Sequence, residues 1–245
     1  MRYHLFRYQR SVFIRNQMEA KSMIINNIDA VRGALLAGFG LLAMGTPQAA
    51  ALVQDATEST RSCRQNAMPA CRELNQVVSF NLRTGQQRAA VGTPDPIWSI
   101  NGSPANTVAH PSWSDNGRAT WVSSATQGRQ SVAGGEHVYT ANIWFDQDPY
   151  LYDFVRTNLT LGADNTVVSV AVNGTEVYTG DGGNHDFQSF ENFVHGDDAN
   201  WPWVRGCNEV RVTIRNSGGP SGMSVRGAVR ARCSRCLTAR PPQSD

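Results

Sequence analysis

Residues 162–180 have the sequence GADNTVVSVAVNGTEVYTG, and this stretch decides the fold class. Apolar residues alternate with small or polar ones on both sides of Asn173-Gly174, a period of two that is typical of half-buried strands. Asn-Gly suits the two-residue turn of a β-hairpin, because both central residues of that turn need positive φ angles. The stretch therefore predicts two antiparallel strands joined by a tight turn.

Short alternating runs of the same kind continue on both sides of this hairpin. The predicted strands are residues 76–82, 118–124, 137–145, 152–161, 166–172, 176–180, 209–215 and 223–233. Connectors rich in Gly, Pro, Asn and Asp separate them, and no segment of a dozen residues after Ala51 has helical periodicity. Residues 187–194 form one helical turn at most. About eight strands without intervening helices predict an all-β fold, an antiparallel sandwich of jelly-roll type.

Alternation also assigns the faces of these strands, since successive side chains point to opposite sides. The predicted apolar faces contain Val168, Val170 and Val172, then Val210, Val212 and Ile214, then Met223, Val225, Val229 and Ala231. The opposite side of the last two strands carries Arg211, Arg215, Arg226, Arg230 and Arg232. We expect these arginines to form one basic outer stripe. Hydration of an outer face explains them as well as an anionic glycan does.

The segment before the sandwich has the features of an export signal. Its apolar stretch, residues 34–44, is eleven residues long, follows Arg32 and precedes the small residues Ala49, Ala50 and Ala51. That order is typical of a secretory signal peptide, whereas a membrane span needs about 20 apolar residues. A buried core helix is the alternative.

We therefore expect residues 1–51 to be a signal peptide, preceded by an overrun upstream of a start at Met18 or Met23. A polar tether or irregular cap (52–75), the sandwich (76–233) and a polar tail (234–245) follow. The product is expected to be secreted, periplasmic or at the cell surface, with no membrane span after processing.

Processing changes the charge balance. Without residues 1–51 the basic residues fall from 22 to 16 and the acidic ones from 20 to 18, so the remaining chain has a net charge near −2. The basic character of the full chain therefore gives no support for a nucleic-acid partner. Lys21 is the only lysine, so every basic residue of the exported part is an arginine.

All five cysteines lie in the exported part, where disulfides persist. Folding the last two strands about residues 218–222 as a hairpin brings Cys207 opposite Cys233, provided that a bulge at Gly227 turns both to the same side. We expect a Cys207–Cys233 bond, a local Cys63–Cys71 bond and a free Cys236. The free thiol makes a homo-oligomer or a covalent link to another chain possible.

Several blocks of this sequence resemble a family of exported bacterial domains. They are GTPDPIWSI (92–100), HPSWSDNGRATWVS (110–123), HVYTANIWFD (137–146), GADNTVVSVAVNG (162–174) and NEVRVTIRNSGGPSGMSVRG (208–227). In order and spacing they are similar to the galactose-binding-like β-sandwiches of PEP-CTERM-sorted surface proteins. The resemblance covers about residues 77–232 and implies a binding or structural module. The apolar sorting helix is missing from the end of the sequence.

The loop from Gly180 to Trp203 is the candidate ligand site. It is much longer than an ordinary hairpin loop, and long loops of compact domains are often functional. Trp201 and Trp203 have the spacing that puts two rings on one side of an extended chain, where flat aromatic surfaces stack on sugars. The predicted ligand-binding residues are Trp201, Trp203, Asp181, Asn184, His185 and Asp186. The alternative is that both tryptophans, like Phe187, Phe190 and Phe193, seal the core.

The other tryptophans, Trp98, Trp113, Trp121 and Trp144, lie in or beside strands and are expected in the core. Asp181, Asn184 and Asp186 also supply oxygen ligands at turn spacing, so a structural Ca²⁺ is a possible cofactor, although the full EF-hand spacing is absent.

We predict a non-catalytic extracellular binding module whose partner is a carbohydrate or cell-surface glycan. A structural or adhesive subunit that binds another protein chain is the second hypothesis. A glycoside hydrolase-like enzyme is the third hypothesis. It requires that two carboxylates of the long loop face each other across a cleft.

Overall fold

The structure is a computed structural model that describes residues 63–85, 89–182, 187–196 and 202–234. These ranges contain eleven strands, one short 3-10 turn, η1 (Pro149–Leu151), and a helical turn at residues 63–65. The strands are β1 (Val77–Asn81), β2 (Pro94–Ile100), β3 (Ser103–Val108), β4 (Trp121–Ser123), β5 (Gly135–Phe145), β6 (Tyr152–Asp164), β7 (Thr166–Val172), β8 (Thr175–Thr179), β9 (Glu191–His195), β10 (Gly206–Asn216) and β11 (Gly222–Cys233). The prediction of an all-β, antiparallel sandwich is confirmed.

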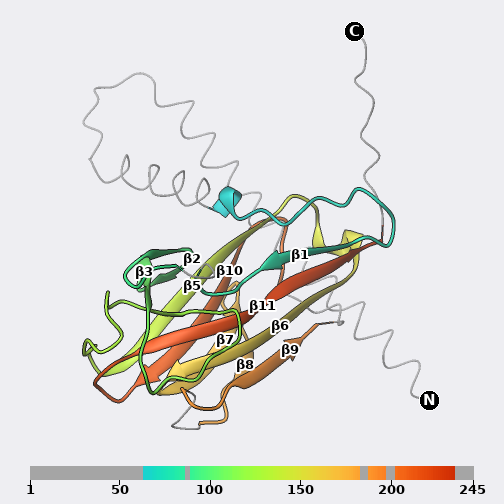
Figure 1. The fold of residues 1–245 in the computed structure, drawn as a ribbon. Coiled ribbons are helices and arrows are strands. Elements are labelled where there is room, and N and C mark those ends of the chain that lie inside the picture. Colours follow the sequence, from blue (N-terminus) through green and yellow to red (C-terminus); the bar gives the residue numbers. More distant parts are fainter. Residues whose placement is uncertain (1–62, 86–88, 183–186, 197–201, 235–245) are drawn as a thin grey trace, which may run out of the picture. The chain divides into compact units, whose positions relative to one another are not determined.

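Ten strands follow one hydrogen-bonded path in the order β8-β7-β10-β5-β2-β3-β4-β11-β6-β9, and β1 pairs with the same edge of β11 as β4 does (Figure 1). Every pairing of these strands is antiparallel. The path folds back through β2, β3 and β4, so that β7, β10 and β5 share one apolar core with β11 and β6. The result is a sandwich of two layers that remain joined along one side.

The predicted hairpin is present between β7 and β8. Val172 pairs with Thr175, and both residues of the turn between them, Asn173 and Gly174, have positive φ angles of 49° and 78°. Positive φ at both positions is the geometry for which Asn-Gly is suited. The hairpin prediction is confirmed.

All eight predicted strands are present, and three more were missed. β2 and β3 have the sequences PDPIWSI and SPANTV, whose prolines and weak alternation hide their strand character. The third is β9: within the stretch expected to form one helical turn at most, Glu191–His195 pairs with β6 along the edge of the layer. A segment as short as β9 has no hydrogen-bond partners of its own for a strand, and β6 supplies them.

The predicted apolar faces are buried with one exception. Val168 is half-buried, and Val167 is buried in its place. The register between β7 and β10 shifts between Thr213 and Ile214, so that Ile214 pairs with Val167. One extra residue in a strand reverses the alternation beyond it.

β10 and β11 do not pair with each other, which contradicts the hairpin expected at the end of the chain. β10 lies between β5 and β7, whereas β11 lies between β6 and the strands β4 and β1. The turn from Asn216 to Gly222 therefore carries the chain from one layer to the other. The five arginines are exposed as expected, but they belong to the outer faces of two layers and do not form one stripe.

The same topology overturns the predicted disulfide pairing. The four predicted cysteines are bonded, but Cys63 pairs with Cys207 and Cys71 pairs with Cys233, each with a Cα–Cα distance of 5.8 Å. Cys207 and Cys233 lie in different layers, so that neither can reach the other as a hairpin neighbour. Cys236 lies outside the described residues.

The predicted bulge at Gly227 is also wrong. The pairing of β11 with β6 runs without a shift from Arg226 through Gly227 to Ala228. A Cβ atom at position 227 would lie 2.0 Å from the carbonyl oxygen of Asn158. Gly227 is therefore explained by the close approach of the β6 backbone, and Cys233 stays on the apolar face.

Residues 63–75 are bound to the sandwich. Cys63, Met68 and Cys71 are buried, and the amide of Met68 donates to the carbonyl of Trp144 over 2.8 Å. Two disulfides tie this segment to β10 and β11. Of the two descriptions given to residues 52–75, that of an irregular cap suits this described part. The signal peptide (1–51) and all but Ser234 of the tail lie outside the described residues.

Candidate functional site

The long loop does not present its described tryptophan to a ligand. Trp203 is 5% exposed and lies flat against Phe145 of β5, with ring centroids 5.2 Å apart and an angle of 9° between the planes. Phe145 in turn meets the edge of Tyr152, so three rings close one end of the core. The assignment of Trp203 to a sugar-binding surface is therefore wrong, since burial within the sandwich leaves no face for a sugar.

The other residues predicted at this loop are only partly described. Asp181 follows β8 and is exposed. Trp201, Asn184, His185 and Asp186 lie outside the described residues. Phe193 is in the main core, whereas Phe187 and Phe190 are half-buried against Trp113 and Trp121. The calcium site at Asp181, Asn184 and Asp186 stays a prediction; within the described ranges no three acidic, histidine or cysteine side chains group as metal ligands would.

An open groove lies instead at the end of β5, on the outside of the sandwich. It has a volume of about 440 Å³ and is lined by Arg64, Ala67, Trp144, Asp146 and Arg205. Trp144 is half-buried, in contrast to the core position expected for it. Its neighbours Ile143 and Phe145 are fully buried, so alternation along β5 turns the indole outward.

The indole of Trp144 is held in place by neighbours from three segments. Its Nε1–H donates to the Asp146 carboxylate over 2.6 Å. The guanidinium carbon of Arg64 lies 4.7 Å from the ring centroid, within the range of a cation–π contact. Gly206 of β10 lies beside the ring, where a Cβ atom would be 3.8 Å from it. The ring is therefore fixed before any ligand arrives.

The backbone around the groove is also fixed. The amide of Trp144 donates to Asn66 and its carbonyl accepts from Met68, so residues 66–68 run along the end of β5. The Cys63–Cys207 disulfide lies next to Arg64 in the sequence and two residues from Arg205. This one bond holds the two arginine-bearing segments on either side of the indole.

Asp146 affects a second aromatic side chain. Burial raises the pKa of the Tyr152 hydroxyl, and the negative charge of Asp146 raises it further. Asp146 therefore carries its charge near both Trp144 and Tyr152. The groove thus combines an aromatic surface, two guanidinium donors and one carboxylate acceptor, which can bind a polar ring through stacking and hydrogen bonds.

Trp98, Trp113 and Trp121 are structural, as expected. Trp98 is 1% exposed and its Nε1–H donates to the carbonyl of Leu82 over 2.8 Å. Trp113 and Trp121 are buried in a second, smaller cluster, with ring centroids 4.7 Å apart. Trp113 also donates to Asp164 over 2.8 Å.

The sequence did contain a signal for Trp144. In HVYTANIWF the residues of the buried set are His137, Tyr139, Ala141, Ile143 and Phe145. A strict period of two places Trp144 on the other side. The expectation that tryptophans in strands are core residues overrode that signal.

Comparison with known proteins identifies no family. No family model matches this chain, and no curated protein matches it either. The resemblance to domains of PEP-CTERM-sorted proteins therefore rests on the sequence motifs alone.

Several solved structures are similar at low levels. A family 35 carbohydrate-binding module from Clostridium thermocellum is 13% identical and covers 54% of this chain and 90% of its own, with a TM-score of 0.32. A family 35 module from Cellvibrio japonicus is 14% identical and covers 66% and 99%, with a TM-score of 0.33. A cyclase from Fischerella sp. TAU, in complex with 4-(1H-indol-3-yl)butan-2-one, is 12% identical and covers 69% and 81%, with a TM-score of 0.31. At these TM-scores we draw no functional argument from the likeness.

Proposed function

We propose that this protein is a non-catalytic extracellular binding module and that its ligand is a carbohydrate bound in the groove at Trp144. The observation that carries the proposal is a half-exposed indole at an open groove, flanked by Arg64, Arg205 and Asp146. Ligand sites combine apolar surface with a few placed polar groups. A sugar ring offers both matching features, a face of C–H groups for the indole and hydroxyls for the charged side chains.

Rigidity of the groove supports a binding role. The indole is pinned by a hydrogen bond, and the segments on either side are joined by a disulfide. A site that is ordered before binding loses less entropy when the ligand arrives. The described lining contains one carboxylate, whereas glycoside hydrolases commonly place two on either side of the scissile bond.

The two disulfides support export, because such bonds persist in oxidising compartments and are rare in the cytosol. No helix among the described residues is long and apolar enough to cross a membrane. The signal-peptide hypothesis for residues 1–51 is tested by the amino terminus of the exported product, expected within a few residues of Leu52. A product that retains residues 23–45 would contradict it.

The test of the proposal is retention on a panel of polysaccharides, measured by affinity electrophoresis and then by calorimetry on any retained ligand. Trp144→Ala should weaken binding about 30-fold, because truncating an aromatic anchor costs about 2 kcal/mol. Trp144→Phe should retain most of the affinity. Both variants should melt close to the wild type, since the indole is outside the core.

Two results would contradict the proposal. One is that no neutral or charged polysaccharide of the panel is retained. The other is that Trp144→Ala binds as tightly as the wild type. Reduction of the Cys63–Cys207 bond provides a further check. It releases both arginine-bearing segments and should therefore weaken binding, as Trp144→Ala does.

A second candidate function rests on the cysteine count. The two disulfides use four of the five cysteines, which leaves Cys236 without a cysteine partner in its own chain. A structural or adhesive subunit linked to another chain through Cys236 would elute as a larger species that reductant dissociates. An unchanged elution volume with and without reductant would favour the binding module alone.

A further inference from the structure

The outer face of the β1-β11-β6 layer carries a concentration of arginines that the Trp144 groove does not involve. Arg226, Arg230 and Arg232 project from β11, and Arg156 projects from β6. Val225, Val229 and Ala231, which are direct sequence neighbours of the β11 arginines, are buried, and this fixes the guanidinium groups on the outer side. We call these four arginines together with Phe154 the basic face.

The strand register brings like charges together on this face. Arg230 lies directly opposite Arg156 on β6 and opposite Ser79 on β1. Ser79, Arg230 and Arg156 therefore form one row across β1, β11 and β6.

Phe154 holds two of the arginines against the sheet. The guanidinium carbon of Arg232 lies 4.9 Å from the ring centroid, and that of Arg156 lies 5.6 Å away. Cation–π contacts of this kind limit the rotamers of two long side chains. The cationic groups are therefore partly ordered before an anion arrives, which favours binding.

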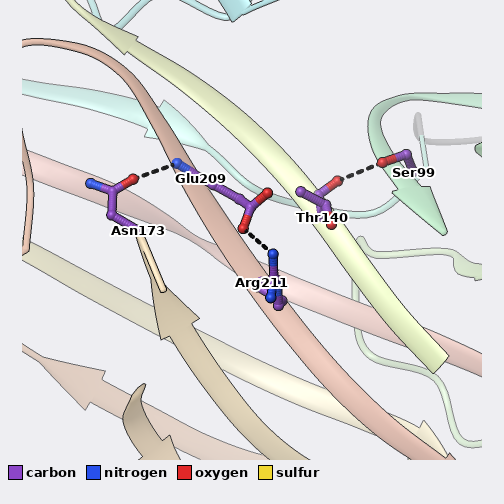
Figure 2. A network of polar contacts seen from close by, with 5 residues as sticks. All are labelled: Ser99, Thr140, Asn173, Glu209 and Arg211. Carbon is purple, nitrogen blue, oxygen red and sulfur yellow. Dashed lines mark hydrogen bonds and ion pairs between the residues drawn. The ribbon is translucent and has the colours of Figure 1, made fainter. Parts of the chain in front are cut away.

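In the other layer, the arginines of β10 are neutralised by carboxylates of the protein itself. On β10, Arg211 binds the carboxylate of Glu209 over 2.7 Å, and Arg215 binds Glu136 over 3.1 Å. Figure 2 shows the first pair within a network of polar contacts on that face. In the described part of the chain, no ion pair is formed by Arg226, Arg230 or Arg232.

We propose that the basic face binds a linear anionic polysaccharide through its carboxylate or sulfate groups. Arg226 and Arg232 are six residues apart, or about 20 Å along a strand, so the β11 arginines can contact successive groups of an extended chain. The planar guanidinium fork matches carboxylate and sulfate oxygens in pairs. This site is separate from the Trp144 groove and does not depend on the function proposed for it.

The shape of the face favours a polysaccharide over two other polyanions. The major groove of DNA admits a helix or a two-stranded ribbon, which a broad sheet face cannot imitate. A membrane surface is usually bound by an apolar face inserted beside the cations, whereas this face is polar apart from Phe154, Val77 and Ala228. An extended polysaccharide needs neither a narrow element that enters a groove nor an apolar surface that enters a membrane.

The experiment compares two matched double variants. R230Q/R232Q removes two charges from the basic face, and R211Q/R215Q removes two from the opposite layer. Binding to polygalacturonate and to heparin is measured at low salt and at about 0.15 M salt. The carboxylated and sulfated probes separate the two sources of negative charge.

We expect the wild type to bind at least one of these probes, and less tightly as salt rises because exposed charges are screened. R230Q/R232Q should lose about tenfold or more in affinity, whereas R211Q/R215Q should stay within about twofold. Trp144→Ala should bind the anionic probe like the wild type, which separates this site from the groove.

Three results would overturn the proposal. They are no binding to either probe at low salt, an equal loss in both double variants, and binding to DNA or to anionic vesicles that is as tight as to the polysaccharides. Circular dichroism and melting temperature serve as controls for folding. All variants should fold, because every substituted arginine is exposed.

Discussion

The surroundings of Asp164 alter the chemistry of its carboxyl group. It is 8% exposed and accepts the indole N–H of Trp113 over 2.8 Å. Burial raises the pKa of its carboxyl group, and this effect exceeds those of the Trp113 hydrogen bond and the charge of His110, which both lower it. Asp164 therefore serves as a hydrogen-bond acceptor that joins the small tryptophan cluster to β6.

A pH dependence follows from that shift. A carboxyl whose pKa is higher in the folded than in the unfolded protein binds its proton more tightly in the folded state. Its ionisation therefore lowers stability as pH rises through the window above the ordinary aspartate pKa of about 3.9. Asp164→Asn keeps an acceptor for Trp113 but cannot ionise. The stability of this variant relative to the wild type should increase from about pH 3 to about pH 7 in urea denaturation.

The control for this prediction is Asp153→Asn, an exposed position on the same strand. Its stability relative to the wild type should change little over the same range. A constant difference between Asp164→Asn and the wild type would show that the carboxyl ionises equally in both states.

Asp95 shows how one side chain attaches an element to the next. The carboxylate of Asp95 is buried at the start of β2 and accepts the amides of Ile97 and Trp98 over 2.8 and 2.7 Å, as well as that of Gly85. The indole of Trp98 donates to Leu82. Asp95 and Trp98 belong to the block GTPDPIWSI of the family resemblance, and their contacts hold residues 82–85 against β2.

Asp95→Ala should lower the free energy of unfolding by about 3–4 kcal/mol, because charge-assisted hydrogen bonds are lost and buried amides are left without an acceptor. Asp95→Asn should cost less, since one carbonyl oxygen remains. The denaturant midpoint measures both, and Asp153→Ala should stay within about 0.5 kcal/mol as an exposed control. A loss below 1 kcal/mol for Asp95→Ala would contradict this role.

On the scale of the whole molecule, the two disulfides bind the segment before β1 to both layers. Residues 63–71 are attached to the start of β10 in one layer and to the end of β11 in the other. Because these strands do not pair with each other, the covalent links supply a connection that the hydrogen-bonded path does not provide at this end.

Removing Cys71–Cys233 by a double alanine substitution should therefore be costly. With Cys63–Cys207 intact, the ring closed by the second bond contains residues 63–71 and residues 207–233, which are nine and 27 residues long. Closing a ring of this size restricts the unfolded chain by about 4 kcal/mol in the loop-entropy model. The loss should appear in the midpoint of chemical denaturation.

Peptide mapping without reduction checks the pairing itself. It should yield the Cys63–Cys207 and Cys71–Cys233 peptides. A Cys207–Cys233 peptide would contradict the topology as well as the pairing, because it requires β10 and β11 to be neighbours. Thiol titration of the unfolded, unreduced chain should give one thiol, which belongs to Cys236.

Local patterns of the sequence determined much of the sheet. Eight strands, the hairpin at Asn173-Gly174 and nearly all of the buried valines follow from alternation and turn chemistry, because both depend on residues close in the chain. The outward position of Trp144 was also present in that alternation. β9 was not, since five residues without strong alternation form a strand only when β6 offers an edge.

The sequence by itself determined the fold class, the sides of the strands and which residue types face solvent, because the period of two is a property of each strand. Only the tertiary structure decided which strands are neighbours. That choice separated Cys207 from Cys233 and divided the arginines between two faces. It placed Arg156 opposite Arg230 and buried Trp203 against Phe145. It also brought Arg64 and Arg205 to the groove at Trp144. These contacts connect residues far apart in the chain, and pairing over such distances is set by the packing of the whole core.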